Sequence, residues 1–97
     1  MRILVFEQAS IETDVNTSQK DRTIVHVHVV PARPGQLLVI QLHLRERFGW
    51  WPEGHQRLNR RSKARFKVAP SRAKARIVLT LNDGATVLAA SKPFKLR

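Results

Sequence analysis

Nine cationic side chains lie within twenty residues of this 97-residue sequence, and no acidic residue interrupts them. They are Arg57, Arg60, Arg61, Lys63, Arg65, Lys67, Arg72, Lys74 and Arg76. Residues 1–21, in contrast, carry four acids and two bases. Such segregation of charge is typical of an electrostatic binding surface. The basic tract therefore predicts the binding of an anionic polymer, most of all the phosphates of nucleic acid.

Three aromatic residues, Phe48, Trp50 and Trp51, stand just before the basic tract. Aromatic rings beside cations form platforms on which unstacked bases lie. Adjacent residues of a strand face opposite sides of the sheet, so one tryptophan is available as a clamp beside the cations. In the alternative interpretation both tryptophans anchor a loop over the end of the fold, because tryptophan is highly buried on average. We include Trp50 and Trp51 in the predicted nucleic-acid site.

The sequence contains four histidines, a residue type that commonly binds metals. His26, His28 and His43 fall in two consecutive predicted strands, and three imidazoles that converge across a hairpin bind zinc or copper. No carboxylate lies near them in the sequence to orient the rings. We therefore predict histidines on a half-buried sheet face, with no metal and no cofactor.

The sequence carries no recognisable enzyme motif. It has no glycine-rich phosphate loop, no Gly-x-Ser-x-Gly and no His-Glu-x-x-His. Its seven acids are scattered, and no pair has the strand spacing that general acid and base catalysis requires. The absence of cysteine excludes disulfides, thiolate zinc sites and cysteine nucleophiles. These features predict a non-catalytic protein.

Hydrophobic residues recur with a period of two, which predicts strands rather than helices. The alternating segments are 23–30, 36–45, 63–68, 74–81 and 85–90, followed by a short edge strand at 94–96. Two polar or glycine-containing segments, about 7–22 and 46–62, are predicted as long loops. The chain thus predicts a single all-β domain over residues 1–97, an immunoglobulin-like antiparallel sandwich. A five-stranded OB-type barrel is the alternative.

Turn residues predict how these strands pair. Two prolines and a glycine in 31–35 indicate a hairpin that joins 23–30 to 36–45. The sequence Asn82-Asp83-Gly84 indicates a second hairpin, because these residues tolerate positive φ. If strands 63–68 and 74–81 are neighbours, five cations share one exposed sheet surface: Lys63, Arg65, Lys67, Lys74 and Arg76.

The predicted function is a binding module that captures nucleic acid on this basic sheet face with low sequence specificity, since phosphate contacts do not read bases. The alternative is a structural or protein-interaction module that docks on an acidic partner or belongs to a larger assembly. In that case the edge segments 94–96 or 3–6 would pair with a second copy. The apolar run at 3–6 is too short for a signal peptide or a transmembrane helix, so we expect a cytoplasmic protein.

Overall fold

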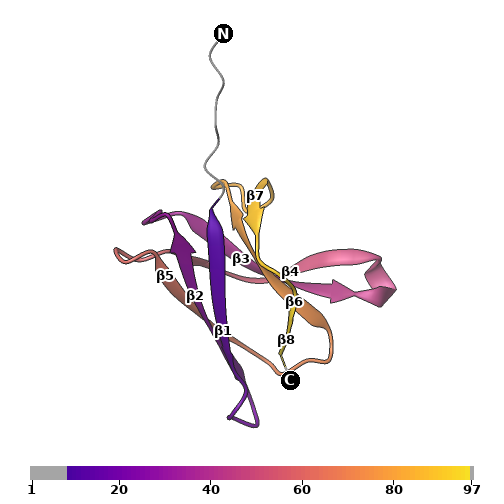
Figure 1. Cartoon of the computed structure of the whole chain (residues 1–97). Helices are drawn as coiled ribbons and strands as arrows, with labels where there is room; N and C mark the ends of the chain where they lie inside the picture. The colour runs from indigo at the N-terminus through magenta and orange to yellow at the C-terminus, as the bar shows by residue number, and fades with distance from the viewer. Residues whose placement is uncertain (1–8, 97) are drawn as a thin grey trace.

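The computed structural model describes residues 9–96, which form two facing antiparallel sheets (Figure 1). Its elements are β1 (Ser10–Asn16), β2 (Thr23–Val30), β3 (Leu37–Leu44), the 3-10 turn η1 (Arg45–Arg47), β4 (Gly49–Arg57), β5 (Lys63–Val68), β6 (Lys74–Thr80), β7 (Val87–Ala90) and β8 (Phe94–Lys95). The smaller sheet has the order β1-β2-β5. The larger sheet has the order β4-β3-β6-β7, and β8 also pairs with β6.

Both sheets are open, so the predicted sandwich is confirmed and the closed OB-type barrel is not formed. The chain crosses between the sheets after β2, β4 and β5, as in an immunoglobulin-like sandwich. These crossings decide which strands become neighbours, and hence which cations meet.

The core lies between the two sheets and follows the alternation of the sequence. On β2 the inward residues are Val25, Val27 and Val29, each buried. They meet Leu38 and Ile40 of β3 in one apolar cluster, which also contains Leu58, Phe66, Ala75, Ile77, Leu79 and Leu96. Because alternate residues fill this cluster, the residues between them stand on the outer faces of the sheets.

Both predicted long loops contain a strand, and in this respect the loop predictions are wrong. Residues 10–16 form β1, with Ile11 and Val15 turned toward the core. Residues 49–57 form β4 despite Pro52 and two glycines. An edge strand tolerates proline, and the ladder between β3 and β4 shifts register between Ile40 and Gln41, beside this proline. The irregularity hides the alternation that marks the other strands.

The predicted hairpin of β2 with β3 is also wrong. β2 pairs with β1 and β5, whereas β3 pairs with β4 and β6. The segment 31–35 is a crossover between sheets, held where the backbone N–H of Arg33 donates to the Ser62 hydroxyl at 2.6 Å. The second hairpin is confirmed, because β6 and β7 pair around the Asn82-Asp83-Gly84 turn and Gly84 has φ +70°.

The short strand predicted at 94–96 is present as β8, two residues that pair with β6. The other edge segment considered for self-association, residues 3–6, lies outside the described residues. Pairing of β8, or of residues 3–6, with a second copy of the protein stays a prediction.

Candidate functional site

The basic tract does not form one sheet face. β5 belongs to the smaller sheet and β6 to the larger, so the prediction of five cations on one surface is wrong. Lys63 and Arg65 stand on the outer face of the smaller sheet, and Lys74 stands on that of the larger sheet. The short connection 69–73 carries the chain across the sandwich, and alternation alone does not reveal such a crossing.

Four tract cations meet where the edges of the two sheets lie side by side. β4 and β5 are the edge strands of their sheets and contact each other. Between them lies a hollow of about 550 Å³, which we call the edge cleft. Its lining residues are Gln56, Arg57, Asn59, Lys63, Ala64, Arg65 and Lys67. The edge cleft thus holds four cations and no carboxylate.

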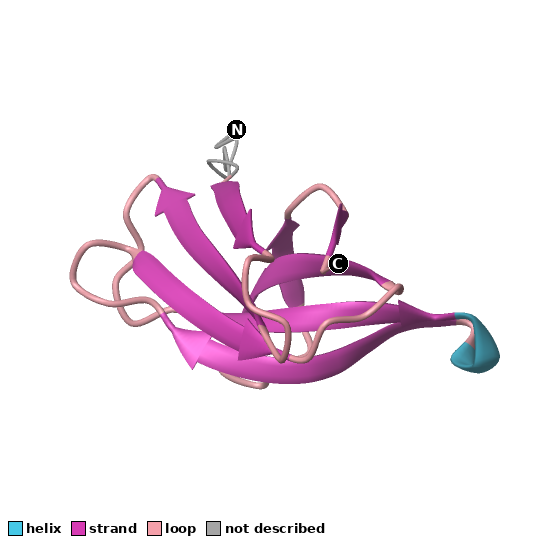
Figure 2. Cartoon of the chain, turned by 90° about the horizontal axis from the view of Figure 1, so that it is seen from below, coloured by secondary structure: helices cyan, strands magenta, loops and turns pink. Residues whose placement is uncertain are grey.

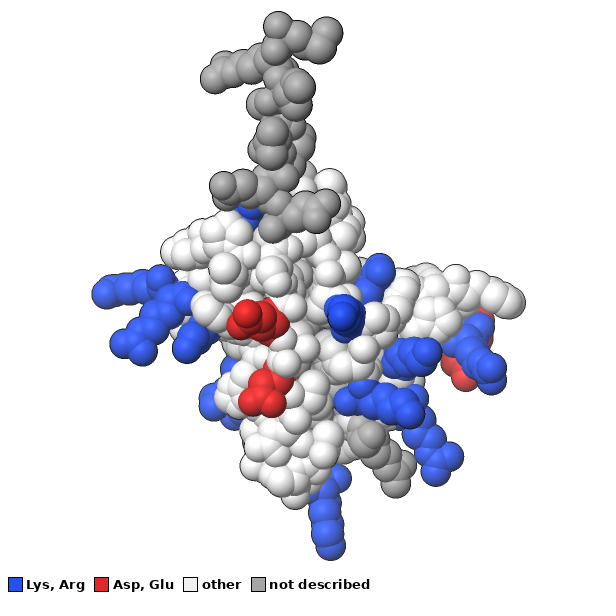
Figure 3. Space-filling view, viewed as in Figure 1, with Lys and Arg blue, Asp and Glu red and all other residues white. Residues whose placement is uncertain are grey.

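The acidic residues of β1 lie away from the edge cleft. The register of the smaller sheet places Glu12 of β1 opposite His28 of β2, which in turn lies opposite Lys63 of β5. The row formed by Asp14, His26 and Arg65 has the same order. Two strand spacings, about 10 Å, therefore separate each carboxylate from the cation in its row. Figure 3 shows Lys and Arg gathered on two sides of the molecule, with acidic side chains between them over β1.

Within residues 9–96, no ion pair with a carboxylate is found for the cations of the tract. The contacts between basic and acidic side chains there are Arg22 with Asp21 at 4.0 Å and Nδ1 of His28 with Oε2 of Glu12 at 3.5 Å. Neither pair includes a tract residue. The positive charge of the tract is therefore presented to solvent, where it is available to an external anion.

A second basic hollow lies on the outer face of the larger sheet. We call it the aromatic basin. It has a volume of about 530 Å³ and is lined by His43, Arg45, Trp50, Arg72, Ala73, Lys74 and Pro93. Trp50 and His43 face each other across β4 and β3, and the connection 69–73 and β6 supply Arg72, Ala73 and Lys74. Three cations thus surround one tryptophan, and again no carboxylate is among the lining residues.

The ring of Trp50 is fixed by contacts on its own sheet. The Arg76 guanidinium carbon lies 4.4 Å from the ring centroid, and the His43 ring meets Trp50 edge-on at 5.2 Å between centroids. Nε of Arg76 donates to Oε1 of Gln41 at 2.8 Å, which orients the guanidinium. Partial burial lowers the pKa of Arg76 below its ordinary value, but arginine stays charged in proteins. Arg76 therefore holds Trp50, which lines the aromatic basin, in place.

Trp51 points away from Trp50, as expected for neighbours on a strand. Its Nε1–H donates to the backbone oxygen of Arg47 at 3.2 Å, and the Arg47 guanidinium lies 5.2 Å from its ring centroid. The side chain is exposed. Trp51 thus lines neither basic hollow, and its contacts are with the turn η1.

Three predicted cations, Arg60, Arg61 and Arg76, line neither hollow, and sequence reasoning missed three residues. Arg60 and Arg61 are exposed in the turn between β4 and β5, where Oδ1 of Asn59 accepts from the N–H of Arg61 at 2.9 Å. Arg45 and His43 line the aromatic basin but lie before the tract in the sequence. Phe48, noted beside the tryptophans but not included in the site, is 95% exposed. The sequence does contain a signal for Arg45, because this cation stands close to the aromatic residues Phe48, Trp50 and Trp51.

The histidines do not converge. His26 and His28 stand on the outer face of the smaller sheet and His43 on that of the larger, so the three-histidine cluster considered from the sequence is not formed by these residues. The part of the chain that the structure describes contains no group of three or more His, Cys, Asp or Glu residues placed to hold a metal ion.

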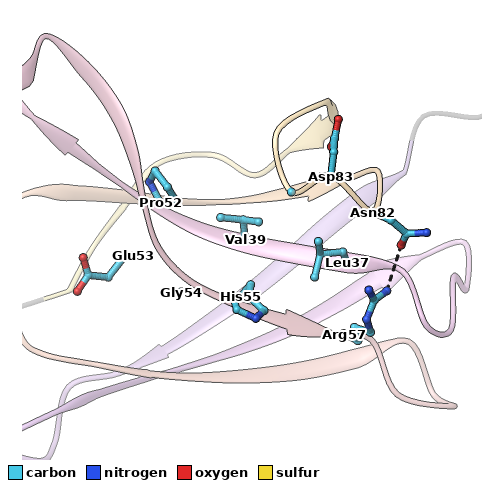
Figure 4. Close-up of a pocket in the computed structure, with 10 residues that line it drawn as sticks. Leu37, Val39, Pro52, Glu53, Gly54, His55, Arg57, Asn82 and Asp83 are labelled. Carbon is cyan, nitrogen blue, oxygen red and sulfur yellow. Dashed lines mark hydrogen bonds between the residues drawn. The ribbon is translucent and has the colours of Figure 1, made fainter.

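A third hollow has mixed charge and lies on the same face as the aromatic basin (Figure 4). Leu37 and Val39 form its floor, and it has a volume of about 520 Å³. Arg57 stands at its side, where Nη1 donates to Oδ1 of Asn82 and to the backbone oxygen of Gly35, both at 3.1 Å. These bonds hold the guanidinium of Arg57 beside the third hollow, and the same residue also lines the edge cleft.

The chain matches no protein-family model, no curated protein and no solved structure. Among residues 9–96, no helix is long and apolar enough to span a membrane.

Proposed function

We propose that this protein binds nucleic acid through the sugar–phosphate backbone, with low sequence specificity and without catalysis. The observation that carries the proposal is the edge cleft, a hollow lined by four cations and by no carboxylate. Its cations come from two strands of different sheets, so the charge is concentrated by the fold and not only by the sequence.

The edge cleft favours a polymer over a single small anion. Lys63, Arg65 and Lys67 occupy alternate positions of one exposed edge, which spaces them about 7 Å apart. A row of like charges repels itself and destabilises the compact state. A polyanion laid along the edge removes that repulsion and releases its own condensed counterions.

The aromatic basin extends the same surface. Trp50 and Arg57 are seven residues apart on β4, a distance of about 24 Å along the strand. A nucleic acid that follows β4 meets the cations of both hollows and passes the third hollow between them, whose lining includes Glu53 and Asp83. Contacts to phosphates position a protein without reading bases, which accounts for the low specificity that we propose.

Charge reversal in the edge cleft tests the proposal. Lys63→Glu combined with Arg65→Glu should weaken binding to a labelled oligothymidine by about ten-fold or more, because two charge-assisted phosphate contacts are lost. Binding is measured by fluorescence anisotropy at about 50 mM salt. The matched control is Lys20→Glu combined with Lys92→Glu, which changes the net charge equally at exposed residues that line neither basic hollow.

Two results would contradict the proposal. Equal weakening by both double variants would show that overall charge, and not the edge cleft, attracts the oligonucleotide. A native protein that ignores the oligonucleotide and changes its mass with concentration would favour the alternative interaction module.

A further inference from the structure

The β3–β4 hairpin projects beyond the body of the sandwich and ends in the turn η1 (Figure 2). Its tip reads Arg45-Glu46-Arg47-Phe48-Gly49. Phe48 follows η1 directly, and its backbone N–H donates to the oxygen of Arg45 at 3.3 Å. The hairpin therefore carries one phenylalanine to an outlying point of the molecule, between the 3-10 turn and the start of β4.

Phe48 is unfavourable for folding in two independent ways. Its side chain is 95% exposed, the highest value among the exposed large apolar residues. Its backbone has φ 52° and ψ 45°, the left-handed conformation that helix ends usually give to glycine. A bulky residue in this region is an outlier, and such outliers cluster at functional sites.

The neighbouring aromatics are already engaged. The guanidinium of Arg76 lies over the ring of Trp50. Trp51 contacts the guanidinium of Arg47 and donates a hydrogen bond to the backbone oxygen of Arg47. The ring of Phe48 is instead presented to solvent. Two guanidinium groups accompany it, because Arg45 and Arg47 form the ends of η1. Arg45 also lines the aromatic basin, so cations continue from the hairpin tip to that hollow.

We propose that Phe48 is a stacking residue that inserts between neighbouring bases of a single nucleic-acid strand, while Arg45 and Arg47 contact the flanking phosphates. This inference rests on the proposed function, which concerns the sugar–phosphate backbone, and adds a contact between the protein and the bases. Every base has a π-face, so stacking of this kind is tolerant of sequence. A single strand is favoured over a duplex, because its bases need less unstacking.

The hairpin tip fits bases better than a lipid surface. Insertion into a bilayer strengthens with buried apolar area, and here the exposed ring of Phe48 stands beside Arg47 and Glu46. The cations behind the tip line a hollow on the sheet face, where a strand reaches them but a flat bilayer that contacts the tip does not.

Removal of the ring, compared on two polymers, tests this role. The polymers are a short labelled oligothymidine and an abasic strand of equal length, which carries the same phosphates without bases. Phe48→Ala should weaken binding to the oligothymidine by at least about five-fold and leave binding to the abasic strand unchanged. Phe48→Tyr keeps a ring and should retain the native affinity. Leu88→Ala removes another exposed apolar side chain, far from the hairpin in sequence, and should change neither affinity.

The outcomes separate the two proposals. Native protein that binds neither strand would overturn the proposed function and this inference with it. Native protein that binds both strands, with Phe48→Ala weakening both equally or neither, would leave the proposed function standing and overturn the stacking role. Binding to phosphatidylserine vesicles that requires Phe48, without any difference between the two strands, would assign the ring to lipid and overturn the inference.

Discussion

At the scale of single residues, the fold gives three nearby aromatics three different environments. Trp50 packs under Arg76 and beside His43, Trp51 contacts η1, and Phe48 is left in solvent. The sequence identifies aromatic residues beside cations, but it does not indicate which ring is free. That distinction depends on Arg76, which reaches Trp50 only because β6 and β4 flank β3 in one sheet.

The conformation of Phe48 predicts a stability difference between two small replacements. Phe48→Gly should be more stable than Phe48→Ala by about 1 kcal/mol, because alanine keeps the steric cost of left-handed backbone and glycine does not. Glycine's greater entropy in the unfolded chain offsets part of that gain. Chemical denaturation of both variants measures the difference. An alanine variant as stable as the glycine variant would contradict the left-handed conformation.

At the scale of elements, the β6–β7 turn depends on Asp83. Its carboxylate accepts hydrogen bonds from the Thr86 hydroxyl and from the backbone N–H groups of Thr86 and Ala85. The bond from the Thr86 hydroxyl is the largest cause that lowers the pKa of Asp83, to about 2. The fold therefore favours the ionised carboxylate, which organises the turn.

This lowered pKa predicts a pH-dependent stability. Because the folded pKa lies below the ordinary value of 3.8, the contribution of Asp83 is complete above pH 3.8 and is lost as the pH falls toward 2. Asp83→Ala should lower the melting temperature at pH 7 and make a smaller difference near pH 2. Thr86→Val, which removes the hydroxyl donor, should show a weaker form of the same trend. If Asp83→Ala lowered the melting temperature equally at pH 7 and near pH 2, the stabilising role of the ionised Asp83 carboxylate would be contradicted.

The regular strands could be predicted from sequence and the irregular ones could not. Residues 23–30 and 63–68 form strands with the predicted bounds, because both alternate strictly around buried valines or Phe66. The sequence of β4 indicates a loop, because Pro52 and two glycines interrupt its pattern, and in the structure the ladder shifts register beside this proline. β1 was missed because Ile11 and Val15 are four residues apart, a spacing that fits a helical turn as well as a strand.

Strand pairing is the step that sequence pattern did not supply, and it determines the site. Alternation identifies the inward residues of a strand but not the sheet that the strand joins. The segment 31–35 crosses between sheets although its prolines and glycine are typical of a hairpin. Eight of the nine tract cations are exposed and Arg76 is half-buried. Which cations line the edge cleft and which line the aromatic basin could be read only from the fold.

At the scale of the whole molecule, charge is distributed unevenly around the sandwich. The net charge is +11, and the linings of the two basic hollows together hold seven cations and no carboxylate. Self-repulsion of this kind destabilises a small domain. A bound polyanion opposes it, because a ligand that binds only the native state raises stability.

If both basic hollows bind phosphates of one nucleic acid, the affinity must fall steeply as the salt concentration rises. The association constant for a labelled oligothymidine is measured at several salt concentrations between about 50 and 200 mM. If seven cations each neutralise one phosphate, the log–log slope should be roughly −5 for a single strand. A slope near zero, or no binding at the lowest salt concentration, would contradict the claim.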